Sequence, residues 1–89
     1  MRHELEQILG ESLRILAIET RERLHLTQKK MGAKLHMSES SYSDIETGAS
    51  YCGALTEALL LSMQEDPTQF LHTVREKFMK WYEREMQIV

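Results

Sequence analysis

Side chains that could do chemistry are scattered along this 89-residue chain. Four serines fall between residues 38 and 43, but no histidine or lysine stands at the spacing of a catalytic base, so no nucleophile is indicated. The four histidines are spread over the whole sequence, and the single cysteine, Cys52, lacks a partner for a disulfide or a ligand-spaced zinc site. The sequence therefore predicts a protein that is not an enzyme and that uses no metal and no cofactor.

The charge pattern points to binding rather than catalysis. The formal net charge is -3, whereas most small DNA-binding domains are basic. Residues 21–36 carry five Lys or Arg side chains against one acid, and residues 37–51 carry three acids and no Lys or Arg. A basic segment thus runs directly into an acidic one, and the two would respond in opposite ways to a row of phosphates.

The apolar periodicity predicts an all-α fold of one domain over residues 1–89. No segment alternates with the two-residue period of a strand, and apolar residues recur at three- and four-residue steps. Five helices are expected, at about residues 3–24, 28–35, 38–48, 54–63 and 66–86. Gly10 is a possible break in the first of them. The core is expected to bury six side chains: Met31, Leu35, Tyr42, Ile45, Leu55 and Leu59.

Helix boundaries are marked by capping residues. Thr27, Ser38 and Asp66 are suited to the N-cap position, where a side-chain oxygen accepts from a free backbone N–H. Pro67 fits the first position of the last helix, and Gly48 suits a left-handed residue that closes the third. No apolar run has the length of a membrane span, and carboxylates interrupt the first thirteen residues. These features predict a cytoplasmic protein without a membrane anchor.

One stretch carries a recognisable pattern, residues 27–48, which read TQKKMGAKLHMSESSYSDIETG. It opens on Thr27 and Gln28, has the small residue Gly32 five positions into the motif, and ends in the run 42–48, YSDIETG. The pattern resembles the helix-turn-helix of the Cro and lambda-repressor type, also called the xenobiotic-response-element family. The resemblance implies a lambda-repressor-like five-helix bundle, with a helix-turn-helix core at about 9–63 and a long C-terminal helix at about 66–86.

The family pattern also assigns roles to individual positions. Gly32 would lie where the second and third helices cross closely, and Arg21 and Glu46 match positions that often form an ion pair. His36 stands where many members have glycine in the turn. The resemblance implies that double-stranded DNA is contacted by the second helix at phosphates and by the third in the major groove. The implied DNA-binding residues are Gln28, Lys29, Lys34, Ser38, Glu39, Ser40, Ser41, Ser43, Asp44 and Thr47.

Two functions are consistent with these residues. The family pattern favours a sequence-specific transcriptional regulator that acts by occupying an operator. However, the outward positions of the third helix include no Arg, Lys, Asn or Gln, the side chains that make bidentate base contacts. Glu39 and Asp44 would also face phosphates. The alternative is a protein-binding antirepressor or inhibitor that keeps the scaffold and presents its acidic helix to a protein partner.

The last helix carries an aromatic stripe that includes the only Trp and both Phe residues of the chain. Aromatic residues and Met concentrate at protein interfaces, and repressors of this fold commonly dimerise. The stripe therefore predicts either closure of the protomer's own core or a homodimer interface, and both can hold along one helix. The residues assigned to the interface are Val74, Phe78, Trp81, Tyr82 and Met86.

Overall fold

A computed structural model describes residues 2–86, which form five α-helices and no strand. The all-α prediction is confirmed. The helices are α1 (Arg2–Arg23), α2 (Gln28–Lys34), α3 (Glu39–Thr47), α4 (Ala54–Ser62) and α5 (Pro67–Met86). Each lies within two residues of the bounds expected from capping residues and periodicity. Residues 1 and 87–89 of the predicted single domain lie outside the described part.

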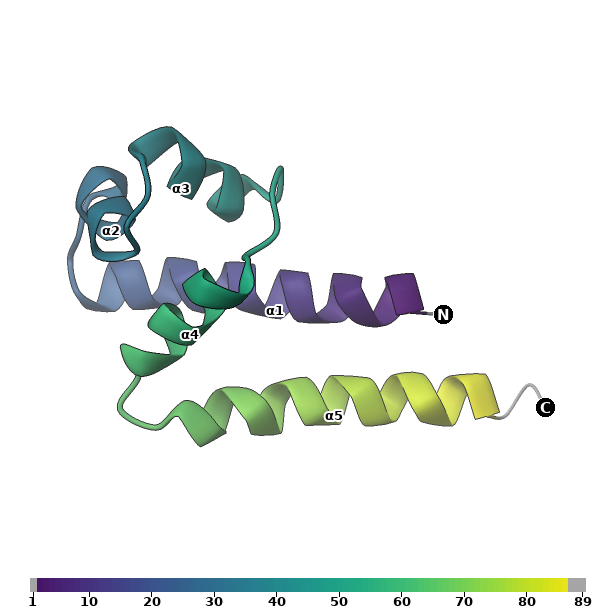
Figure 1. Ribbon diagram of the computed structural model, residues 1–89. Helices are drawn as coiled ribbons and strands as arrows, with labels where there is room; N and C mark the ends of the chain where they lie inside the picture. The colour runs from purple at the N-terminus through teal and green to yellow at the C-terminus, as the bar shows by residue number, and fades with distance from the viewer. Residues whose placement is uncertain (1, 87–89) are drawn as a thin grey trace.

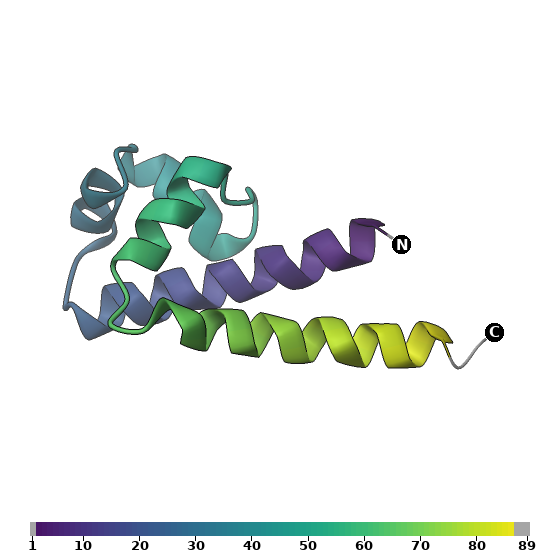
Figure 2. The same cartoon turned by 60° about the horizontal axis from the view of Figure 1, so that its bottom comes forward.

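The chain has two parts. Helices α2, α3 and α4, together with the C-terminal half of α1, are called the head below, and α5 forms an elongated arm with α1. In Figure 1, α2 and α3 lie above the C-terminal half of α1, and α4 crosses in front of it. Helix α5 then runs back along α1 in the opposite direction, so that the start of α1 and the end of α5 lie at the same end of the molecule (Figures 1 and 2). The described residues span 47 × 27 × 19 Å. The α1–α5 pair, called the arm below, accounts for this elongation.

The core lies inside the head, where α1, α2, α3 and α4 converge. Seven residues form its buried cluster: Leu13, Ala17, Met31, Leu35, Tyr42, Ile45 and Leu60. Four of the six expected core residues belong to that cluster, and Leu59 is partly buried against it. The expectation for Leu55 is wrong, because its exposed fraction is 69%. Leu55 lies five residues before Leu60, about 140° around α4, so burial of Leu60 turns Leu55 outward.

Helix α1 does not break at Gly10, which is also a correction. A Cβ atom at position 10 would overlap the ring of Tyr51, from the loop between α3 and α4. Tyr51 therefore lies directly on the backbone of α1, and a larger residue at position 10 would push its ring away. The glycine serves a close contact between loop and helix and leaves the helix continuous.

Candidate nucleic-acid interface

Gly32 sets the distance between α2 and α3. A Cβ atom built at position 32 would lie 3.1 Å from the carbonyl oxygens of Met37 and Ser38, and 3.3 Å from the Cβ of Tyr42. Two of these three neighbours are backbone atoms, which cannot rotate away as the end of a side chain can. The expected close crossing at Gly32 is thus present, and it orients α3 relative to α2.

The ends of these helices are closed as their sequence indicates. Thr27 accepts from the backbone N–H of Lys30 at the start of α2, and Ser38 accepts from that of Ser41 at the start of α3. Gly48 closes α3 with φ 84°, in the left-handed region. The three caps use oxygen acceptors and a glycine in the roles predicted for them.

Two histidines adopt the left-handed conformation that is usually reserved for glycine. His36 has φ 58°, in keeping with its place where many family members have glycine in the turn. His25 has φ 55°, which the sequence analysis did not predict. Each follows a helix, and the backbone bonds around each have the six-to-one and five-to-two pattern of a Schellman motif. At α1 these bonds run from Leu26 to Arg21 and from His25 to Glu22. The sequence feature that could have indicated the motif at position 25 is the apolar residue Leu26 directly after it, because an apolar residue at this place often accompanies a Schellman motif.

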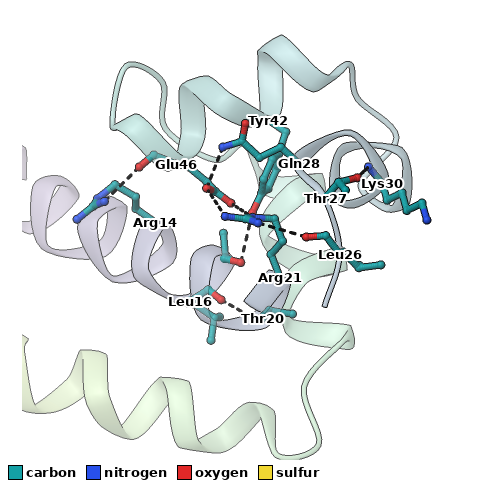
Figure 3. Close-up of polar contacts among 11 residues, drawn as sticks. Arg14, Leu16, Thr20, Arg21, Leu26, Thr27, Gln28, Lys30, Tyr42 and Glu46 are labelled. Atoms are coloured by element: carbon teal, nitrogen blue, oxygen red, sulfur yellow. Dashed lines mark hydrogen bonds and ion pairs between the residues drawn. The ribbon is translucent and has the colours of Figure 1, made fainter. Parts of the chain in front are cut away.

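An ion pair fastens α3 to α1. Arg21 Nε lies 2.6 Å from Glu46 Oε2, and a second guanidinium nitrogen donates to Glu46 Oε1 at 3.2 Å (Figure 3). The remaining nitrogen of Arg21 donates to the carbonyl of Leu26 at 3.2 Å. The side chain of Glu46 is 8% exposed and that of Arg21 is 23% exposed. The expected pair is therefore present, bidentate and largely shielded from solvent.

The environment of Glu46 keeps its carboxylate charged. Burial alone would raise its pKa, but hydrogen bonds from Arg21 and Gln28 outweigh burial and hold the pKa of Glu46 below its ordinary value. The adjacent Tyr42 is fully buried, and its hydroxyl donates to the carbonyl of Ala17 at 3.3 Å. Burial raises the pKa of the Tyr42 phenol, so that it stays protonated. The network is fixed in one charge state near neutral pH.

Gln28, which is predicted to contact DNA, also has a structural role within the protein. Its side-chain Nε2 donates to Glu46 Oε1 at 3.1 Å, which links the start of α2 to the ion pair (Figure 3). The residue is only half-buried. Its amide retains one N–H and its carbonyl oxygen for an external ligand. The structure thus presents Gln28 to solvent in an orientation set by Glu46.

The predicted DNA-binding residues divide into three groups on the surface. A shallow groove between the starts of α2 and α3 is lined by five of them: Gln28, Ser38, Glu39, Ser40 and Ser43. Lys29 and Lys34 are exposed on α2, outside this groove. Ser41, Asp44 and Thr47 are exposed on α3 outside the groove, and Thr47 donates its hydroxyl proton to the Asp44 carbonyl. The outward face of α3 therefore combines hydroxyl groups with two carboxylates.

Arg14 is a further residue that sequence reasoning did not single out. One of its guanidinium nitrogens donates to the backbone carbonyl of Glu46 at 3.1 Å, near the C-terminal end of α3 (Figure 3). A cation there is favourable because the helix dipole is negative at that end. Arg14 also pairs with Glu11, one turn earlier in α1. The three-residue spacing of Glu11 and Arg14 could have predicted their ion pair, but not the contact of Arg14 with α3.

The residues predicted for a dimer interface lie on two sides of α5. Val74 and Trp81 are buried within the protomer, and Phe78 is partly buried. Trp81 Nε1 donates to Glu4 Oε2 of α1 at 2.5 Å. Tyr82 and Met86 are exposed instead. The inner side of the aromatic stripe thus closes the arm, and its outer side faces solvent.

Residues 2–86 hold no group of three or more His, Cys, Asp or Glu side chains placed to bind a metal ion. Within the same range, none of the helices combines the length and apolarity needed to cross a membrane.

Comparison with known proteins identifies the head of the molecule. Residues 18–52 match the family model described as helix-turn-helix, which covers α2, α3 and the end of α1. This family consists of DNA-binding proteins and is not a family of enzymes. No curated protein and no solved structure matches the chain significantly. The close α2–α3 crossing at Gly32 and the Arg21–Glu46 pair lie within the matched range. This segment is thus similar to the helix-turn-helix proteins of the Cro and lambda-repressor type.

Proposed function

We propose that the chain is a cytoplasmic transcriptional regulator that binds double-stranded DNA as a homodimer and acts by occupying an operator. The observation that carries the proposal is the rigid presentation of α3 within a matched helix-turn-helix. Gly32 and the Arg21–Glu46 pair hold α3 from behind, while most of its outward side chains remain exposed. A recognition helix needs this combination, because base contacts depend on placement within a fraction of an ångström.

The roles of the individual residues follow from their positions. Lys29 and Lys34 would neutralise phosphates beside the groove, and Gln28 would donate its free amide N–H at the start of α2. The hydroxyl groups of α3 would contact base edges with little discrimination, and Glu39 and Asp44 would each need a cytosine amino group. Sequence selectivity would therefore rest on a few cytosine contacts and on DNA shape.

A second function is favoured by one specific observation. Glu39 and Asp44 are both exposed on α3, and no Lys or Arg lies between residues 37 and 51 to offset them. An acidic helix on this scaffold suits a basic protein surface better than a phosphate backbone. The alternative function is an antirepressor or inhibitor that binds a protein through α3.

A titration against random-sequence duplex DNA at low and moderate salt separates the two functions. The DNA proposal expects measurable binding at low salt that weakens as salt rises. Replacing Lys29 and Lys34 with Ala should reduce the slope of log affinity against log salt by about 1 for each lost phosphate contact. The control is Glu76→Ala, because Glu76 is exposed on α5 and remote from the head. This change should leave the slope unaltered. Absence of binding at low salt, together with no effect of the lysine changes, would favour the protein partner.

A further inference from the structure

Helix α5 carries a second apolar face that no other part of residues 2–86 covers. Four of its large apolar side chains are exposed, by 65% for Leu71, 50% for Met79, 48% for Tyr82 and 70% for Met86. At 100° per residue they fall within a sector about 80° wide, and Arg75 lies at the middle of that sector. These five residues are called the outer stripe: Leu71, Arg75, Met79, Tyr82 and Met86.

The outer stripe differs from the side of α5 that closes the arm. Val74 and Trp81 are 3% and 5% exposed, and Trp81 bonds to Glu4 of α1. A helix that is apolar on more than one side requires more than one neighbour. Monomeric proteins rarely leave several large apolar side chains contiguous and exposed, and such patches usually mark an interaction site. Since α1 occupies the inner side, the outer stripe has no occupant among the described helices.

The order of residues along the stripe fits a second copy of the same helix. If two α5 helices pair in antiparallel orientation about a point between Phe78 and Met79, Leu71 comes level with Met86 of the second copy. Arg75 then comes level with Tyr82 of the second copy. Each contact occurs twice by symmetry, as an isologous two-fold interface requires. The paired length, from residue 71 to residue 86, is about 22 Å at 1.5 Å per residue.

The charges select this orientation. Neither Arg75 nor Glu83 has an ion-pair partner among residues 2–86. In the antiparallel register, Glu83 of the second copy follows the Tyr82 that faces Arg75, so the guanidinium meets both a ring and a carboxylate. Contact of Arg with an aromatic face is favourable in its own right. A parallel register would set Arg75 against the Arg75 of the second copy.

We propose that the outer stripe is the homodimer interface, formed by antiparallel pairing of α5 with α5 of a second copy. This inference identifies the interface of the homodimer in the proposed function. It rests on the homodimer part of that proposal and not on DNA binding. It places two of the five residues predicted for an interface, Tyr82 and Met86, in the contact. Val74 and Trp81 remain within their own protomer.

Sedimentation equilibrium of the full chain without DNA tests this pairing. The wild type should dimerise at micromolar concentration. Arg75→Glu should raise the dimer dissociation constant at least about tenfold, because the new carboxylate then faces Glu83 of the second copy. Glu83→Arg should weaken the dimer similarly, and the double change R75E/E83R should restore it to within about threefold of the wild type. Within one protomer the two positions are eight residues apart, so a restored dimer reports contact between copies.

The control variant is Lys80→Glu, which makes the same change of charge elsewhere on the exposed surface of α5. It should leave the dimer unchanged, and circular dichroism should show the same helix content for every variant. A monomeric wild type at high micromolar concentration would overturn the proposal. So would single reversals without effect, or a double reversal that stays monomeric. Because no DNA is present, these outcomes are independent of whether α3 binds a duplex.

Discussion

Arg21 and Glu46 meet across the head with two hydrogen bonds of 2.6 and 3.2 Å, although 25 residues separate them in the chain. The pair connects the end of α1 to the last turn of α3 and is shielded on most sides. Removing one member of a shielded pair leaves the other charged and unpaired, whereas removing both leaves no such charge. Replacement of one residue or of both should therefore have different consequences.

Replacing Arg21 with Met should lower the free energy of unfolding by about 3 kcal/mol, because Glu46 is then left in a poorly hydrated site. Glu46→Met should cost less, since Arg21 is more exposed and reaches solvent. The double replacement R21M/E46M should be more stable than the sum of the single costs predicts. Urea unfolding of the four proteins measures this coupling. Additive costs would show that the two side chains act independently.

The same pair should make stability depend on pH. Because the pKa of Glu46 is lower in the folded protein, the folded state binds this proton less readily than the unfolded chain. The stabilisation is complete above the unfolded pKa, near 4.3, and is lost as pH falls through the lower folded pKa. Glu46→Gln should remove this contribution, so the stability difference between wild type and variant should shrink below about pH 4. A constant difference from pH 7 to pH 3 would contradict the assignment.

Enlarging Gly32 should strain the crossing of α2 and α3. Gly32→Leu should destabilise the protein by about 1–3 kcal/mol or more, because the side chain would collide with the carbonyls of Met37 and Ser38. Ala33→Leu is the matched control, since the neighbouring residue is exposed on the same helix. Thermal unfolding followed by circular dichroism compares the two variants. Equal midpoints for G32L and A33L would show that the crossing has room to spare.

Glycine at the two left-handed histidines should stabilise the protein. His25→Gly and His36→Gly should each raise the free energy of unfolding by up to about 1 kcal/mol, because glycine adopts positive φ without steric cost. The same replacement at His72, exposed inside α5, should lower it by roughly 0.3–0.5 kcal/mol. Chemical denaturation distinguishes these opposite signs. A loss at position 36 would mean that the imidazole contributes more than its backbone strain costs.

The carboxylates on α3 should oppose DNA binding wherever α3 approaches phosphates. Changing Glu39 and Asp44 to Gln and Asn removes two negative charges and keeps the side chains polar. Under the DNA proposal, affinity for random duplex should rise, while a lost cytosine contact should cost about 1–3 kcal/mol at its own base pair. Under the protein-partner alternative, duplex binding should stay negligible. Fluorescence anisotropy with labelled duplex measures both.

Much of the head could be predicted from local sequence signals. Thr27, Ser38 and Gly48 mark helix ends through bonds made within a few residues, so the sequence contains all the information needed. Leu55 was misplaced because the three polar residues of α4, Thr56, Glu57 and Ser62, are spread around the helix and mark no single outer face. Only packing against α1 shows that Leu60 points inward.

Contacts between distant segments were beyond prediction from residue types alone. The bonds from Gln28 to Glu46 and from Arg14 to the end of α3 depend on the angle at which α3 crosses α1. The split of the α5 stripe has a similar origin. Its apolar residues cover about half of the circumference of the helix, and the position of α1 decides that Trp81 is covered while Tyr82 is not.

The bond between Trp81 and Glu4 has a spectroscopic consequence. The chain's single tryptophan lies in the C-terminal half of α5, and its indole is held beside a carboxylate of α1. Its emission should shift to longer wavelength when α5 separates from α1 and water reaches the ring. The head holds the buried Tyr42 and no tryptophan. Opening of the arm and unfolding of the head thus have separate optical signals in the unmodified protein.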